Sequence, residues 1–171
     1  MFPSAFRLES LRREHPRRRF RSGDPEVDRW LRTKALPHQK KHLSVTRVLW
    51  DPTGVIAGYY TLATGQVDFG GLAPELSRRL PRRAMPVAVL AGLGVDMDYP
   101  GQGLGRSLLA RALRDCHDAG ETFAFVAVIL DCTSDHARSC YKHWDFEPLP
   151  GHPYRLFLSA ERLRAMMEVS P

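Results

Sequence analysis

The chain has 171 residues, of which 43% are hydrophobic and 26% are charged, and its formal net charge is +6. This length and composition predict a soluble globular protein with a single domain, residues 1–171, that can bury a sizeable core. No apolar run is long enough to cross a bilayer, so a membrane span is excluded.

The cysteines and histidines argue against disulfide and metal chemistry. The three cysteines, Cys116, Cys132 and Cys140, are odd in number and lack the paired spacing of a disulfide framework or a zinc site. The seven histidines include no HExxH motif. We therefore expect free thiols, a reducing cytoplasmic location and no bound metal.

The first half of the chain predicts a strand, a helix and a hairpin. "AFRLES" has the pattern of a short strand, and the Arg-rich segment after it has that of a loop. "SGDPEVDRWLRTKAL" predicts a helix that is capped by Ser22 or Asp24 and ends near Pro37. Two β-branched and aromatic runs around "DPTG" predict an antiparallel hairpin over residues 45–65.

The second half alternates strands and helices. "LAPELSRRLPRRAMP" is a long connection that can hold a short helix ending near Leu80. After it the pattern predicts, in order, a strand at 87–96, a helix at 101–120 that stops at Gly120, a strand at 122–130, a helix at 134–146 capped by Ser134 or Thr133, and two short strands within 147–159. This order is typical of an α/β protein whose mixed sheet is antiparallel in its first half.

A glycine-rich turn stands out in "DYPGQGLGRSLL", where Gly101, Gly103 and Gly105 lie between a buried strand and a helix. Glycine costs conformational entropy, so the cluster needs a reason. At a helix start several backbone N–H groups lack partners, and the helix dipole adds positive charge. Without Cβ atoms these N–H groups can reach phosphate oxygens, and Arg106 could add a charge-assisted bond. A tight turn without a ligand remains the alternative.

Two phosphate-binding motifs fit this turn poorly. No Gly-Lys-Ser/Thr follows the glycines, which disfavours a P-loop. Asp131 follows the next strand, as a dinucleotide-binding fold requires, but at least four elements precede the turn, whereas that fold begins with it. The turn therefore indicates a cofactor that contains a pyrophosphate and is not NAD.

The stretch "LGVDMDYPGQGLGRSLLARAL" resembles motif A of the GNAT acyl-CoA N-acyltransferase superfamily, in which an Arg/Gln-x-x-Gly-x-Gly/Ala turn follows the fourth strand. The order of elements agrees with that family over nearly the whole chain. The resemblance implies an α/β GNAT fold, with a mixed central sheet of six to seven strands and flanking helices, and acetyl-CoA as cofactor. Pro100 stands where the motif usually has Arg or Gln, so a side-chain phosphate contact is absent there.

Four stretches, "RSGDPEVDRWLRTKALPHQKKHLSVTRVL", "GYYTLATGQV", "MPVAVLAGLGVD" and "SCYKHWDFEPLP", are together similar to the GNAT toxins of bacterial toxin–antitoxin modules. As a group these toxins acetylate the free α-amine of aminoacyl-tRNA. The chain departs from the subgroup at Val27, which replaces a leucine before Asp28, and at Gly92, where members often carry arginine. The resemblance implies a ribbon-helix-helix antitoxin as partner and leaves a homodimer open.

The resemblance also assigns the cofactor site. The exposed backbone of the fourth strand would pair with the amides of the pantetheine arm, and the N–H of Val95 would stabilise the oxyanion. The N–H groups of the turn would face the diphosphate. The implied cofactor-binding residues are Leu93, Gly94, Val95, Gln102, Gly103, Leu104, Gly105, Arg106 and Ser107.

Tyr141 in "SCYKHWDF" matches the family position of the general acid, which would donate a proton to the leaving thiolate. Taken from the residues alone, Tyr141 is better explained as an aromatic side chain packed in the core. Cys140 beside it gives a minor alternative, an acyl-carrying nucleophile aided by His136 or His143.

The acceptor is the least specified part of the reaction. Aminoacyl-tRNA would need a basic surface, for which the candidates are residues 17–21, Lys40, Lys41 and residues 78–83. A small-molecule or protein amine would not need one, and salt-sensitive tRNA binding discriminates between these acceptors. A catalytically silent module that binds CoA is a further alternative. A ribbon-helix-helix repressor encoded immediately upstream would favour the toxin.

Overall fold

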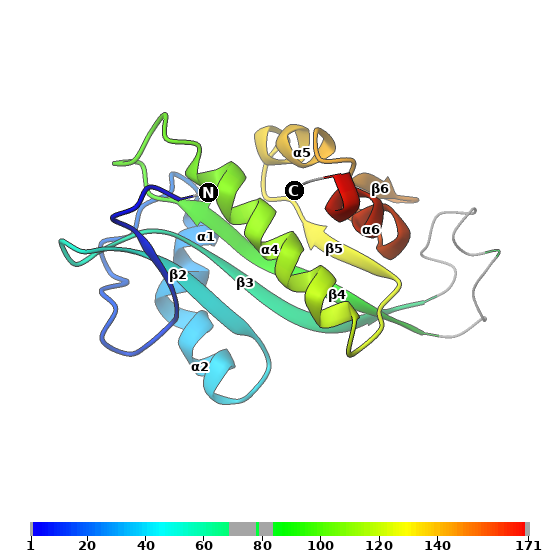
Figure 1. The fold of residues 1–171 in the computed structure, drawn as a ribbon, viewed down its shortest axis with the longest axis horizontal. Helices are drawn as coiled ribbons and strands as arrows, with labels where there is room; N and C mark the ends of the chain where they lie inside the picture. Colours follow the sequence, from blue (N-terminus) through cyan, green and yellow to red (C-terminus); the bar gives the residue numbers. More distant parts are fainter. Residues whose placement is uncertain (1, 69–77, 79–83, 170–171) are drawn as a thin grey trace. The chain divides into compact units, whose positions relative to one another are not determined.

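The fold is a mixed sheet flanked by helices, seen in a computed structural model that describes residues 2–68, 78 and 84–169 (Figure 1). The strands are β1 (Arg7–Ser10), β2 (Val45–Asp51), β3 (Val55–Val67), β4 (Met85–Val95), β5 (Ala127–Asp131), β6 (Glu147–Leu149) and β7 (His152–Ser159). The helical segments are α1 (Pro25–Arg29), the π-helical turn η1 (Trp30–Lys34), α2 (Ala35–Lys40), α4 (Leu104–Gly120), α5 (Asp135–Lys142) and α6 (Ala160–Val169).

The seven strands form one sheet in the order β1-β2-β3-β4-β5-β7-β6. The β1–β2, β2–β3, β5–β7 and β6–β7 pairs are antiparallel, and β4 and β5 are parallel. The mixed seven-stranded sheet and its antiparallel first half confirm the predicted fold class. The short helix predicted within residues 72–86 lies outside the described residues.

The chain divides into two compact units. Residues 1–63 and 90–112 form the first unit, and residues 64–89 and 113–171 form the second. Each unit has its own cluster of buried apolar side chains. The assignment of the whole chain to one domain stays a prediction.

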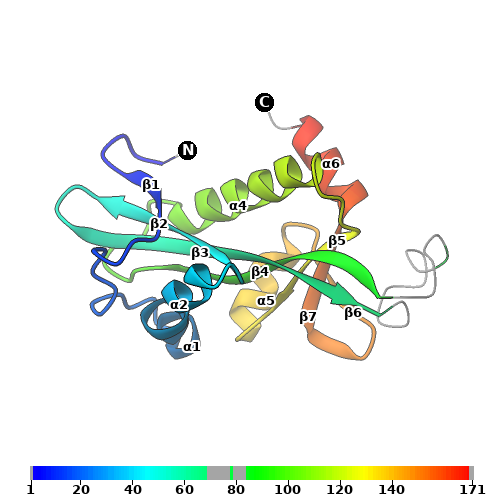
Figure 2. The ribbon, with the colours of Figure 1, turned by 90° about the horizontal axis from the view of Figure 1, so that it is seen from below.

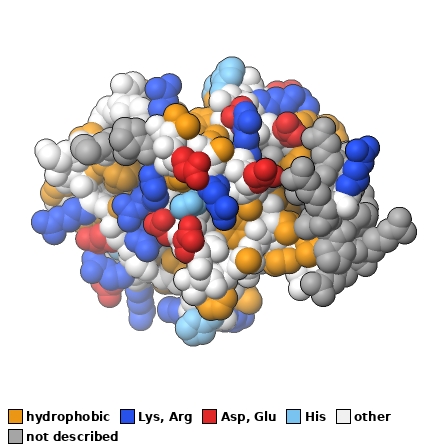
Figure 3. All heavy atoms as spheres, turned by 45° about the vertical axis from the view of Figure 1, so that its right-hand side comes forward, with side chains coloured by type: hydrophobic (Ala, Val, Ile, Leu, Met, Phe, Trp, Pro, Cys, Tyr) orange, Lys and Arg blue, Asp and Glu red, His pale blue; other side chains and the backbone are white. Residues whose placement is uncertain are grey.

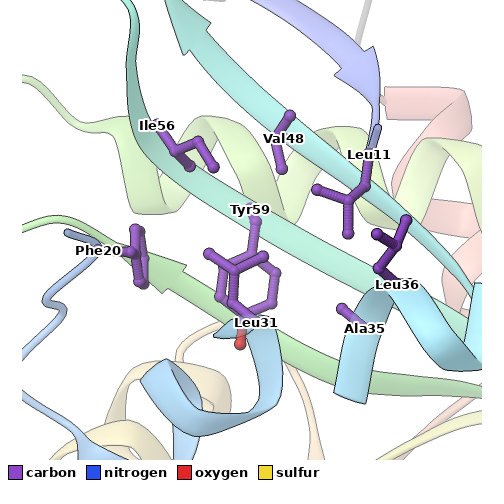
Figure 4. Close-up of a cluster of buried hydrophobic side chains, with 8 residues drawn as sticks. All are labelled: Leu11, Phe20, Leu31, Ala35, Leu36, Val48, Ile56 and Tyr59. Carbon is purple, nitrogen blue, oxygen red and sulfur yellow. The ribbon is translucent and has the colours of Figure 1, made fainter. Parts of the chain in front are cut away.

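The core of the first unit lies between its strands and the helical segment that follows the Arg-rich loop; α1 and α2 cover one side of β2 and β3 (Figure 2). Tyr59 is fully buried there, its hydroxyl donates to the Val27 carbonyl at 2.6 Å, and its ring meets the edge of Phe20. Burying an apolar side chain of this size stabilises the fold by about 1.5–3 kcal/mol. The core residues are Leu11, Phe20, Leu31, Ala35, Leu36, Val48, Ile56 and Tyr59 (Figure 4).

The first helical segment begins as predicted but runs further. Asp24 is the N-cap, and its carboxylate accepts from the N–H groups of residues 26 and 27. The segment was expected to end near Pro37, yet it continues to Lys40. In the π-helical turn the Ala35 N–H donates five residues back, to the Trp30 carbonyl. After this wider turn α2 begins as a new helical segment, so Pro37 lies in its first turn. There the missing proline N–H costs little stability, because N–H groups of a first turn have no acceptor within the helix.

Two glycines let elements approach both faces of the sheet closely in the first unit. A Cβ at Gly94 would lie 2.5 Å from Val27 Cγ1, and one at Gly58 would lie 2.6 Å from Leu108 Cδ1. Val27 belongs to α1, and Leu108 belongs to the part of α4 in this unit. The glycines therefore set how near these helices come to β3 and β4.

The second unit shows three differences from the sequence expectations. The strand expected from residue 122 begins at Ala127, because the N–H groups of Thr122 and Phe123 close a turn onto the Ala119 carbonyl. Helix α6 was not predicted, although Ser159 caps it by accepting from the Arg162 N–H at 3.1 Å. Helix α5 has Ser134 as its cap, as predicted, but it ends at Lys142 and not at Phe146, because residues 143–145 form a turn in which Asp145 has φ +66°. The other predicted elements are confirmed: the 45–65 hairpin, the central strand, α4 ending at Gly120 and the final pair of strands.

No helix in the described part of the chain combines the length and the apolar character needed to cross a membrane.

Replacing Gly58 with alanine should lower the free energy of unfolding by about 1–3 kcal/mol, because the methyl group would overlap Leu108 and the Gly94 carbonyl. Urea unfolding followed by circular dichroism measures the loss. Gly105→Ala is the matched control: its new Cβ would lie 3.6 Å from Val95, an ordinary contact, and alanine is favoured in a helix. An equal loss in both variants would contradict this account of Gly58.

Candidate functional site

The glycine turn between β4 and α4 is open where a ligand would lie. Gly101 has φ +72° and Gly103 has φ +67°, a left-handed conformation that side chains rarely adopt. Apart from the glycine itself and its chain neighbours, no heavy atom of the described residues lies within 4 Å of a Cβ built on either glycine. The backbone conformation and the open space both fit a cradle for phosphate oxygens.

The start of α4 supplies the donors for such a cradle. The Ser107 N–H donates to the Gly103 carbonyl at 3.0 Å, which makes this the first hydrogen bond of the helix. The N–H groups of Leu104, Gly105 and Arg106 belong to the first turn and have no acceptor within the helix. The helix dipole places partial positive charge at the same end, and Gln102 and Arg106 are exposed there. This arrangement favours an anion.

A buried carboxylate fixes the backbone that leads into the turn. Asp96 directly follows β4 and is 5% exposed. Its two oxygens accept from the N–H groups of Arg21, at 3.0 Å, and Asp98, at 2.9 Å. Its own N–H donates to the Ala57 carbonyl at 2.8 Å. Asp96 therefore joins the Arg-rich loop, β3 and the turn at one point.

A tyrosine of the turn makes a second anchor. The Tyr99 hydroxyl donates to Asp51 Oδ2 at 2.9 Å, and its ring meets the edge of Phe6. Burial, followed by the hydrogen bond to Asp51, raises the pKa of Tyr99 to about 12. The Thr53 backbone N–H, and then Tyr99, lower the pKa of the Asp51 carboxyl. At neutral pH the pair is therefore a neutral donor facing a charged acceptor.

Sequence reasoning missed Asp96, Tyr99 and Asp51. The only signal in the sequence was an acid directly after the apolar run "VAVLAGLGV", and the partners of these residues come from distant segments.

The end of β4 extends past its pairing with β5. Among the described residues the parallel register covers Val87–Val89, whereas β4 continues to Val95. Leu93 and Val95 are half-buried and Gly94 is buried. Over Gly92, the nearest atoms to a built Cβ belong to Tyr59, at 3.0 Å, and Trp30, at 3.2 Å. A side chain at position 92 would therefore press against these two aromatic rings.

Tyr141 lies in α5 and is half-buried. Its ring meets Phe146 edge-on, with 5.7 Å between centroids. Burial, followed by the nearby Cys132 and Cys140, raises the pKa of the Tyr141 phenol. The hydroxyl therefore keeps its proton at neutral pH and can act as a donor.

Cys140 is exposed, and its Sγ lies 3.8 Å from His136 Nε2 on the same helix. The structure thus supports His136 rather than His143 as the neighbour of this thiol.

The predicted site residues fall into two groups. The turn, from Gln102 to Ser107, and the end of β4, from Leu93 to Val95, belong to the first unit, and Tyr141 belongs to the second.

In the described residues no three His, Cys, Asp or Glu side chains gather as metal ligands would. His38 and His42 are four residues apart, but α2 ends at Lys40 and His42 has φ +60°, so the two do not share a helical face.

The chain belongs to the acetyltransferase (GNAT) family, whose model matches residues 7–146. This stretch contains the open glycine turn, the end of β4 and Tyr141. Membership confirms the family identified from "LGVDMDYPGQGLGRSLLARAL".

Three known proteins illustrate the similarity. The chain is 34% identical to a tRNA-acetylating toxin of Mycobacterium tuberculosis over 148 residues, which cover 86% of this chain and 88% of the toxin. It has the fold of AtaT complexed with acetyl-methionyl-tRNAfMet, with a TM-score of 0.84, 21% identity and coverage of 95% and 99% of the two chains. It also has the fold of a mutant AtaT toxin bound to the C-terminus of the antitoxin AtaR and acetyl-CoA, with a TM-score of 0.79, 20% identity and coverage of 95% and 98%.

Replacing Gly103 with alanine should weaken acetyl-CoA binding by about tenfold or more, because a Cβ would occupy the open space of the cradle. Isothermal titration calorimetry measures the change. Gly151→Ala is the matched control: Gly151 has φ +78° and an equally open Cβ position, but it lies in the β6–β7 turn. Both variants should lose about 1–2 kcal/mol of stability from the left-handed backbone. Equal affinities for acetyl-CoA would remove the turn from the site.

Proposed function

We propose that this protein transfers the acetyl group of acetyl-CoA to the α-amine of aminoacyl-tRNA and so blocks translation, as the toxin of a toxin–antitoxin pair. The observation that carries the proposal is the 34% identity, over 86% of this chain, to a protein named tRNA-acetylating toxin. Acetylation of that amine would stop the amino acid from entering a peptide.

The glycine turn would hold the diphosphate of acetyl-CoA. The donors would be the N–H groups of residues 102–107, with Arg106 adding charge from the first turn of α4. Pro100 removes one side-chain contact that the family commonly has, but it leaves these N–H groups in place. The binding would therefore depend chiefly on the main chain.

The end of β4 and α5 would supply the chemistry. Bound acetyl-CoA provides the activated acyl group, and the backbone of Leu93–Val95 would hold its pantetheine arm. As the amine attacks, the Val95 N–H would stabilise the negative charge that develops on the acyl oxygen. When the carbon–sulfur bond breaks, the Tyr141 hydroxyl would give its proton to the sulfur. The amine would lose one proton to solvent as the amide forms, and the phenolate would regain one from solvent. Its raised pKa keeps that proton available.

The Arg-rich loop of the first unit is the proposed tRNA surface. Basic side chains of this loop and of the end of α2 are exposed or half-buried and form no ion pair with any described residue. They are Arg17, Arg18, Arg19, Arg21, Lys40 and Lys41. Arg12, in contrast, pairs with Glu9 at 3.2 Å. On the face drawn in Figure 3, basic and acidic side chains are interspersed, so this face is not uniformly positive. Of residues 78–83, only Arg78 is described.

An antitoxin is the proposed protein partner, because a mutant AtaT toxin of the same fold is bound to the C-terminus of the antitoxin AtaR. The ribbon-helix-helix class of this partner is what the resemblance to the toxin subgroup implies. A site of action in the cytoplasm follows from the proposed substrate, since charged tRNA is used there.

Replacing Tyr141 with phenylalanine should lower the transfer of labelled acetyl from acetyl-CoA to aminoacyl-tRNA by about 10²–10⁴-fold, the range for loss of a general acid. Affinity for acetyl-CoA should be unchanged, because only the hydroxyl is removed. In the unchanged protein, the Tyr141 phenol should cause no loss of turnover as pH rises to 10, because its pKa lies above the ordinary value. Full turnover by the phenylalanine variant would refute the assignment, and no transfer to charged tRNA by the unchanged protein would refute the function.

Replacing Arg18 and Arg19 together with glutamine should weaken tRNA binding and reduce the slope of log K against log salt by about 1–2, because each contact with a phosphate releases a counterion. Filter binding between low and physiological salt measures both quantities. Arg164→Gln is the control, since Arg164 is an exposed arginine of α6 outside the proposed surface. An unchanged slope in the double variant would place the tRNA elsewhere.

A further inference from the structure

Helix α5 carries the proposed proton donor but has little of its own to hold it in place. It has eight residues, Asp135–Lys142, and none of them is more than half-buried. A helix this short is unstable alone, and most helices gain their stability by burying an apolar face. The orientation of α5 must therefore depend on other contacts.

Two hydrogen bonds join the first turn of α5 to consecutive residues of β7. Arg138 Nε donates to the Pro153 carbonyl at 2.7 Å, and the Tyr154 hydroxyl donates to Asp135 Oδ1 at 2.6 Å. The Arg138 guanidinium carbon also lies 5.8 Å from the centroid of the Tyr154 ring, in range of a cation–π interaction. Asp135 and Arg138 are three residues apart, so they lie on one side of the helix.

The strand that receives these bonds is itself firmly held. β7 pairs with β5 over five residues, and the Cys132 N–H donates to the Tyr154 carbonyl at 2.7 Å just beyond that ladder. The other end of α5 returns to the sheet through the N–H of Phe146, which donates to the Tyr141 carbonyl at 3.3 Å. Tyr141, one turn after Arg138, is thus itself the acceptor of the second attachment.

We propose that Asp135, Arg138 and Tyr154 form a polar clamp that fixes the angle of α5 on β7 and thereby aims the Tyr141 hydroxyl. The inference rests on the proposed function, in which Tyr141 donates a proton. The three clamp residues are positioning residues, since they act through the helix and not on the reacting atoms. A proton donor displaced by about 1 Å can lose up to about 100-fold in rate, so a clamp at this place can affect turnover strongly.

Tyr154→Phe tests the clamp, because it removes one hydroxyl and keeps both the ring beside Arg138 and the Asp135 charge at the helix N-terminus. We expect kcat for acetyl transfer to fall roughly tenfold with KM for acetyl-CoA unchanged. Hydrogen exchange of the amides of α5 should become faster in the free protein. Arg138→Ala, which removes the bond to Pro153, should have the same two effects.

Two further measurements separate positioning from general structure. In a Tyr141→Phe background, Tyr154→Phe should lower kcat no further, because the aimed hydroxyl is already gone. Arg155→Gln is the matched control: it breaks the neighbouring pair of Arg155 with Asp131, 2.8 Å apart, and leaves the α5 contacts intact. This variant should keep wild-type kcat and wild-type exchange in α5.

The clamp is refuted by unchanged exchange in α5 of Tyr154→Phe, by unchanged kcat, or by an equal fall in kcat in the Tyr141→Phe background. The exchange measurement needs no acceptor and no cofactor. A wild-type protein that fails to acetylate charged tRNA would thus refute the proposed function, whereas unaltered exchange would refute the clamp itself.

Discussion

The candidate site depends on one buried carboxylate. Asp96 ends β4 and binds the N–H groups of Arg21 and Asp98, while its own N–H is bound by the Ala57 carbonyl. A charge buried this deeply is stable only because several donors compensate for its lost hydration. These hydrogen bonds hold the Arg-rich loop, β3 and the glycine turn together at the point where β4 ends. The open N–H groups of α4 are presented at a defined place because the chain behind them cannot shift.

The parts of the site that the sequence revealed are those in which local chemistry is decisive. Gly101 and Gly103 are needed for a left-handed backbone, and leucines at helical spacing mark α4, so both features can be read from adjacent residues. Tyr141 could be assigned a role only through the family, because the sequence around it, taken alone, favours a packed aromatic side chain. Asp96 and Tyr99 could not be assigned, since their partners lie at positions 21 and 51 and meet them only in the folded chain.

The errors at the ends of elements have a similar cause. Pro37 ordinarily stops a helix, but a π-helical turn five residues wide changes the register before it, and no local signal announces that turn. Residues 122–126 are as apolar as a strand. The first two of them, however, form the turn that ends α4, by donating to the Ala119 carbonyl. Helix α6 begins directly after a strand whose pattern runs up to its cap, Ser159, so no turn separates the two elements in the sequence.

A cradle built from main-chain N–H groups places unequal demands on its own sequence. Two positions, Gly101 and Gly103, must keep the left-handed backbone, whereas their neighbours are constrained by conformation and not by side-chain identity. A lineage can therefore exchange residues such as the one at position 100, where this chain has proline, without dismantling the turn. Comparison of relatives by side chains alone will understate how alike their cofactor sites are.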